Sequence, residues 1–209
     1  MRMMIRRAVA ILLVPVLAVA VHAVVASAAP SPGCLPAAAP VFADNSFTPV
    51  EGTYTVPQYP SFESMGASPA TAAAVAASGI ANAQLPAGQA ARFVVNFGPD
   101  GRSVMLVSAP GQLPAQATVV DLARAGGMEI VRQPAGNGSA AEVLAAVGAR
   151  AVPLKIGAFD AALVHADPVG SDDLRPYELH WSDGANDFMV YGVVPPTDVI
   201  ATGRALACH

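Results

Sequence analysis

The sequence predicts a single α+β domain in which antiparallel hairpins form a sheet and about four helices pack on it. Two pairs of β-prone runs are each joined by an Asp-Gly turn, at residues 98–101 and 182–186, which is typical of hairpins. Apolar runs that begin at Ser, Thr or Pro and are followed by Gly lie between them and indicate helices.

The chain divides into a leader at residues 1–28, an extended arm rich in proline and alanine at 29–68, and the α+β domain at 69–209. Without the leader, the length suits one domain that can bury a core.

The leader has the pattern of a secretory signal peptide. Three arginines precede an apolar run over residues 8–25, and small residues at 26–28 stand at the positions that signal peptidase reads. We expect cleavage after Ala28, with Ala29 as the next choice, and a secreted or extracytoplasmic location at the cell envelope. The alternative is an uncleaved membrane anchor, because the run approaches the roughly 20 residues that span a bilayer.

The charge of the chain argues against nucleic acid as a partner. The whole chain carries a formal charge of −4, and loss of the leader removes three arginines and no acid, which leaves −7. Phosphate backbones and anionic lipids are bound through clustered Lys and Arg, which the mature part lacks. We therefore expect membrane contact only through an uncleaved leader, and a protein partner, if there is one, at the envelope or outside the cell.

The two cysteines, Cys34 and Cys208, predict one disulfide bridge. An even cysteine count in an exported chain favours an internal bridge, which would hold both ends of the mature chain together. The alternatives are free thiols and pairing between molecules.

The arm carries spaced aromatic residues, so we expect parts of it to lie against the domain. Ser68 and Pro69 are expected to begin the first helix as its N-cap and first residue. Ser139 and Glu142 form a capping box for a later helix. The expected strands lie at residues 92–97, 103–107, 128–132, 152–156, 161–165, 177–181 and 188–191, and the expected helices at 70–77, 117–125, 140–147 and 198–206.

The last part of the chain combines a strand with Trp, an Asp-Gly turn, an aromatic strand and a closing helix. The residues of this pattern are Leu179-His180-Trp181-Ser182-Asp183-Gly184, Phe188-Met189-Val190-Tyr191-Gly192, Asp198-Val199-Ile200 and Ala205-Leu206. With this pattern, about the last 50 residues resemble the C-terminal part of small exported bacterial domains at the cell envelope, some of them attached to anti-sigma-factor proteins. The resemblance implies an accessory role at the envelope and assigns no catalytic residue.

No catalytic, cofactor or metal pattern stands out in the sequence. Ser139 lacks the G-x-S-x-G context of a hydrolase nucleophile, and no S-x-x-K occurs. The histidines and cysteines show neither H-x-x-x-H nor C-x-x-C spacing, and no phosphate-binding loop is present. We therefore expect no cofactor and no metal.

Glu178 and His180 are the most suggestive pair, because they share one face of an alternating strand while Leu179 and Trp181 share the other. We expect them to form an exposed polar face, since no third group orients the imidazole.

The leading hypothesis is a non-enzymatic exported domain that binds a partner or ligand at the envelope. The first alternative is a divergent secreted hydrolase with His180 as its base, which would require a pocket at His180. The second is an envelope accessory anchored by an uncleaved N-terminus.

Overall fold

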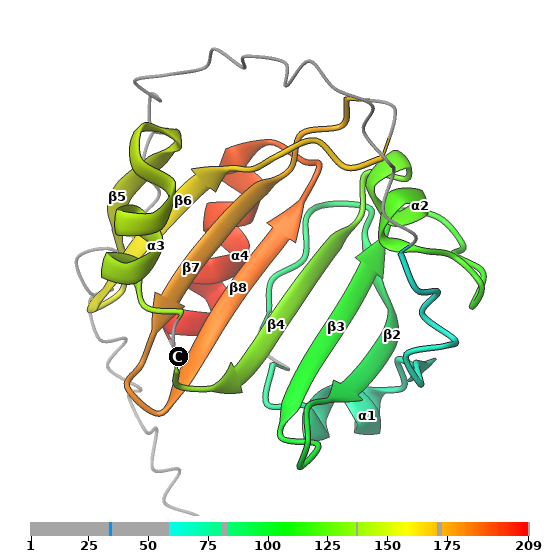
Figure 1. Ribbon diagram of the computed structural model, residues 1–209. Coiled ribbons are helices and arrows are strands. Elements are labelled where there is room, and N and C mark those ends of the chain that lie inside the picture. Colours follow the sequence, from blue (N-terminus) through cyan, green and yellow to red (C-terminus); the bar gives the residue numbers. More distant parts are fainter. Residues whose placement is uncertain (1–33, 35–58, 81–82, 137, 171–172, 209) are drawn as a thin grey trace, which may run out of the picture.

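The protein has an α+β fold dominated by one eight-stranded antiparallel sheet. In this computed structural model the strand order is β1-β2-β3-β4-β8-β7-β6-β5, so the two halves of the sheet meet where β4 pairs with β8 (Figure 1). The described residues are 34, 59–80, 83–136, 138–170 and 173–208, and the expected cleavage sites at Ala28 and Ala29 lie outside them. Among the described residues, no helix is long and apolar enough to cross a membrane.

Four α-helices accompany the sheet, as expected. They are α1 (Ala72–Ala77), α2 (Val119–Arg124), α3 (Ala140–Val147) and α4 (Pro196–Ala207), and a 3-10 turn, η1 (Gly148–Arg150), follows α3. The strands are β1 (Ser68–Pro69), β2 (Ala90–Phe97), β3 (Ser103–Ala109), β4 (Met128–Pro134), β5 (Ala151–Ile156), β6 (Phe159–His165), β7 (Tyr177–Ser182) and β8 (Asn186–Gly192).

Local sequence signals explain most of these boundaries. The capping box at the start of α3 is confirmed, with the Ser139 hydroxyl accepting from the Glu142 N–H and the Glu142 carboxylate accepting from the Ser139 N–H. In the β7–β8 turn, Asp183 Oδ1 accepts the N–H groups of Ala185 and Asn186 at 2.8 and 2.7 Å. Such a side chain satisfies the backbone of a tight turn, which the Asp-Gly sequence predicts.

The predicted start of the first helix is wrong. Ser68 and Pro69 instead form β1, which pairs with Val94 and Phe93 at the edge of the sheet. An edge strand tolerates proline because one side of the strand needs no hydrogen-bond donor. The helix begins after Thr71, whose hydroxyl accepts the Ala74 N–H at 3.1 Å.

One face of the sheet, which we call the α4 face, carries the main core. Helix α4 packs on β5, β7 and β8, and α1 with Ile80 lies over β2 and β3. The Thr202 hydroxyl of α4 donates to the Gln84 carbonyl at 2.8 Å, which joins the two covering segments. This face is closed from edge to edge by apolar side chains, including Leu179 and Trp181.

The opposite face, which we call the α3 face, is covered in two separate parts. Helix α3 packs on β5, β6 and β7, on the left in Figure 1. On the β2–β3 side there is a smaller core. It contains Phe62 from the segment before β1, Leu122 of α2 and Val107 of β3. Phe62 is fully buried there, so this part of the predicted arm lies against the sheet. The strands between the two covers, β4 and β8, carry the site described next.

Candidate functional site

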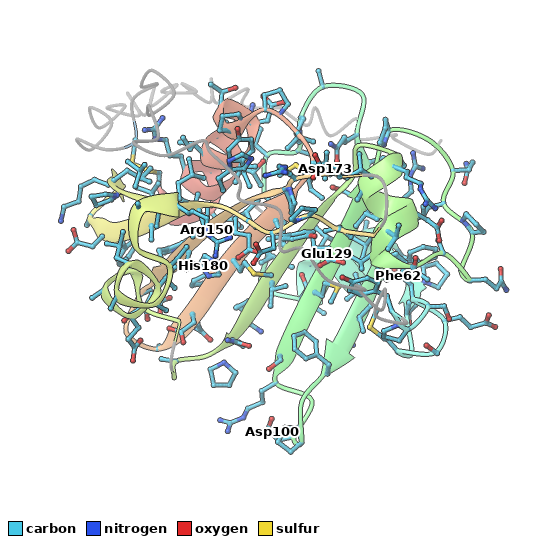
Figure 2. The ribbon with its side chains drawn as sticks, turned by 45° about the horizontal axis from the view of Figure 1, so that its top comes forward. Phe62, Asp100, Glu129, Arg150, Asp173 and His180 are labelled. Atoms are coloured by element: carbon cyan, nitrogen blue, oxygen red, sulfur yellow. A yellow bond between two sulfur atoms is a disulfide. The ribbon has the colours of Figure 1, made fainter. Side chains whose placement is uncertain are left out.

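A row of polar side chains crosses the middle of the α3 face. Glu129 on β4 is directly opposite Tyr191 on β8, and Tyr191 is directly opposite Glu178 on β7. Because facing residues of paired strands project to the same side, the three side chains form one row. In Figure 2, Glu129 lies between the α3 side of the molecule, marked by Arg150 and His180, and the Phe62 side.

Glu129 is a buried carboxyl group with no partner. The residue is 8% exposed, and within the described part of the chain its carboxyl group makes no hydrogen bond or ion pair. The only fully enclosed, unpartnered side-chain atom among the described residues is Arg132 Nε, so the Glu129 oxygens still reach open space. Burial, and secondarily the Glu178 carboxylate, raise the pKa of Glu129 to about 7.

Tyr191 stands between the two carboxyl groups. Burial, followed by the charges of Glu129 and Glu178, raises the pKa of its hydroxyl above the usual range. The hydroxyl therefore keeps its proton at neutral pH and can donate a hydrogen bond.

Glu178 and His180, the pair singled out in the sequence, touch one another on this face. His180 Nε2 lies 2.9 Å from Glu178 Oε2. Their side chains are 26% and 16% exposed, less than a free polar surface would be, because α3 packs against β7. Strand alternation in the sequence predicts this pair, whereas the position of α3 above it depends on contacts between distant parts of the chain.

The face is hollowed near the C-terminal end of α3. This upper hollow, of about 280 Å³, contains Glu178 and Tyr191 together with Arg150 of η1, Asp167 and Tyr59. Arg150 Nη1 donates a hydrogen bond to Asp167 Oδ1 at 2.7 Å, so this positively charged side chain is already paired with a carboxylate. The other lining residues are apolar: Val147, Val164, Ala166, Pro168 and Val169.

A second hollow, of about 360 Å³, lies near the N-terminal end of α3. This lower hollow contains His180, Met189 and Asp187, so the His180–Glu178 contact lies between the two hollows. The Asp187 carboxylate is not available there, since Oδ2 accepts the N–H groups of Gly136 and Gly138 at 2.7 and 3.1 Å.

The segment after β6 adds a wall at the upper end of the site. It runs from Ala166 toward α2, where Gly170 lies so close to Val120 that an added Cβ atom would be 2.9 Å from Val120 Cγ1. Val169 in this segment is buried and bridges to Leu174. The upper hollow is thus bounded by α3, the sheet and this segment.

The serines and histidines around the site offer no further chemistry. Ser139 is committed to the cap of α3, and Ser182 donates to the Asn186 carbonyl at 3.1 Å. His165 stacks on Tyr177, with ring centroids 4.9 Å apart. No group of three or more metal-ligating side chains occurs in the described ranges.

The disulfide lies on the other side of the sheet. Cys34 and Cys208 are bonded, with 6.0 Å between their Cα atoms, so residue 34 is fixed to the end of α4. Gly157 in the β5–β6 turn lies beside Ala207 and Cys208, which places the bridge at that edge.

Comparison with known proteins gives no family for the chain. No protein-family model, no curated protein and no solved structure matches it. The site therefore rests on its own geometry.

The sequence patterns assign no site role to Glu129 or Tyr191, and Tyr59 stands out only as one of the spaced aromatic residues of the arm. A signal for Glu129 was present, because this charged residue lies between the apolar residues Met128, Ile130 and Val131 inside a predicted strand. Buried polar residues are informative in this way, since apolar side chains are the rule there.

Proposed function

We propose that the protein is an exported, non-enzymatic binding domain that acts at the cell envelope or outside it and binds its ligand in the upper hollow of the α3 face. The observation that carries the proposal is Glu129, a buried carboxyl group at the centre of the sheet that has no partner among the described residues and lies next to Tyr191, a residue of the hollow's lining. Buried polar groups are nearly always hydrogen-bonded, and an exception needs a reason. A ligand that completes the site supplies one.

The arrangement of the two faces supports the same proposal. The α4 face is closed by a continuous apolar core, whereas the α3 face is covered only at its two sides. Ligand sites are concave and combine apolar surface with a few converging polar groups. The upper hollow has both, with Glu178 and Tyr191 beside several valines. Export is supported by the leader pattern and by the disulfide, since such bonds persist in oxidising compartments. The resemblance of the C-terminal segment to exported envelope domains agrees with this location.

Valine methyl NMR tests the site. Val147, Val164 and Val169 line the upper hollow, whereas Val190 is fully buried in the core of the α4 face and serves as an internal control. A library of cationic, neutral and anionic small molecules is screened against the full exported chain. We expect at least one compound to shift the signals of the lining valines and leave Val190 unchanged. If no compound of any charge shifts the lining valines, the upper hollow is not a ligand site.

Intact mass under non-reducing conditions tests export. Loss of residues 1–28 and a mass two hydrogens below the reduced value support a cleaved, disulfide-bonded exported form. Retention of the leader would instead favour the membrane-anchored accessory.

The secreted hydrolase is a second candidate, favoured by the 2.9 Å contact between His180 and Glu178 beside the lower hollow. In that case Glu178 would orient the imidazole, and His180 would activate water as a general base. A His180→Ala variant that retains every hydrolytic activity of the purified protein, on ester and peptide substrates, would exclude this candidate.

A further inference from the structure

We infer that the ligand of the upper hollow is an organic cation, an alkylammonium or guanidinium group on a short apolar stem, bound by Glu178 against the ring of Tyr191, with Glu129 beside that ring as a second negative group. The inference rests on the proposed function, that this hollow binds a ligand, and adds the chemical class.

The site has more acidic side chains than basic ones. Glu129 makes no hydrogen bond or ion pair among the described residues, and the contact of Glu178 with His180 uses Oε2. Arg150, the cation in the lining, is bonded to Asp167. Glu178 lines the hollow, whereas Glu129 lies outside the lining, opposite Tyr191 on the neighbouring strand. A positive group in the hollow would therefore contact Glu178 and be attracted by Glu129 as well, and an anionic ligand would be repelled by both.

Aromatic rings add to the selectivity for a cation. Tyr59 and Tyr191 both line the hollow, and the faces of aromatic rings attract ammonium and guanidinium groups. The Tyr191 hydroxyl remains protonated, so the ring brings no negative charge of its own at neutral pH.

The remaining lining points to an organic cation and not a metal ion. Val147, Val164 and Val169 present apolar surface that a hydrated metal ion could not use. The described residues also contain no cluster of three or more metal-ligating side chains. An amine on an apolar stem uses both parts of the hollow.

The affinity should depend on pH through Glu129. A bound cation favours the ionised carboxylate, and the pKa of Glu129 is about 7 in the free protein. The ionised fraction then rises about tenfold from pH 6 to pH 8, so the affinity should rise about tenfold. The groups that face Glu129 are Tyr191 and Glu178, while Tyr59 acts on Tyr191 and His180 contacts Glu178.

Calorimetric titration of the full exported chain with 1,5-diaminopentane tests the inference. The neutral compound 1,5-pentanediol and the dianion glutarate have matched lengths and serve as ligand controls. We expect the diamine to bind at least about tenfold more tightly than either, and about tenfold more tightly at pH 8 than at pH 6.

Two variants and one control assign the effect to the hollow. Glu129→Gln should weaken diamine binding about tenfold at pH 8 and remove most of the pH dependence. Tyr191→Leu should weaken binding at both pH values, because the ring is lost. Asp160→Asn, which removes a charge on an 80% exposed side chain of β6, should bind like the parent protein.

A further arm separates free amines from the side chain of a protein partner. N-acetyl-lysine amide is compared with N-acetyl-norleucine amide, which has the same stem without the charge. If the lysine compound binds more tightly than the diamine, the natural ligand is a lysine side chain of a protein partner. If the diamine binds more tightly, the natural ligand is a free amine. Equal binding of diamine and diol, or unchanged diamine binding by Glu129→Gln, would overturn the inference. The binding site itself would still stand if neutral or anionic library members shift the signals of Val147, Val164 and Val169.

Discussion

Asp187 on β8 accepts two backbone hydrogen bonds from the loop that leads into α3, from Gly136 at 2.7 Å and Gly138 at 3.1 Å, both to the same Oδ2 atom. The residue is 4% exposed. Gly138 approaches so closely that a Cβ atom there would lie 3.0 Å from the Asp187 carboxylate. This contact fixes the start of α3 over the sheet, and α3 forms a wall of both hollows.

Replacing Asp187 with Ala should therefore destabilise the protein by roughly 2–4 kcal/mol, because two partly buried N–H groups lose their carboxylate acceptor, which is itself buried. Asp187→Asn should cost less, since one amide oxygen can accept both bonds. Denaturant unfolding measures the difference, and hydrogen exchange should show faster opening of α3 in the Ala variant. An Ala variant as stable as the Asn variant would mean that the loop does not depend on this acceptor.

Glu129→Gln should make the protein more stable at neutral and alkaline pH. The pKa of Glu129 is about 7 in the folded protein, against an ordinary value of 4.5 for a solvated glutamate. As the pH rises from 4.5 to 7, the unfolded chain loses this proton while the folded protein keeps it, so the stability falls. Above pH 7 the penalty is complete and is on the order of 3 kcal/mol.

The difference in unfolding free energy between Glu129→Gln and the parent should thus grow from pH 4.5 to 7 and then level off. Urea unfolding at several pH values measures it. A constant difference across this range would show that Glu129 is not perturbed. If Glu129→Gln is more stable than the parent protein but binds the diamine less tightly, Glu129 serves binding at the expense of stability, as functional residues often do.

Local structure was predictable from the sequence, and the site was not. The β7–β8 hairpin and α3 depend on neighbouring residues, such as Asp183 in the turn and Ser139 with Glu142 in the cap, so short-range signals located them. The pairing of β4 with β8 brings together residues far apart in the chain. Without that strand order, nothing in the sequence places Glu129 beside Tyr191.

Tertiary contacts also overruled one local signal. Ser68 and Pro69 have the sequence of a helix start, but their pairing with β2 draws them into the sheet. Thr71 can cap the helix three residues later, so the cost of this choice is small.

Replacing both Cys34 and Cys208 with Ser should lower the stability by up to about 5 kcal/mol. The bridge closes a loop with a sequence separation of 174, and the loss of chain entropy in the unfolded state grows slowly with loop length. Thermal unfolding with and without reductant measures this effect. The double variant should lose its response to reductant, and Met189 should keep its chemical shift because the bridge lies away from the α3 face.

Gly203→Ala should destabilise the protein although alanine is the better helix former. Gly203 lies within α4, where a Cβ atom would be 2.4 Å from Leu179 Cδ2, below any real contact distance. Leu179 is fully buried next to Trp181, so it has little room to move. Overpacking of this kind costs about 1–3 kcal/mol, more than the gain of up to about 1 kcal/mol from helix propensity. Leu179→Ala combined with Gly203→Ala provides the check, because removing the clashing atoms should make the second substitution nearly neutral. If Gly203→Ala instead costs as much in the Leu179→Ala background as in the parent protein, the glycine is not required by its contact with Leu179.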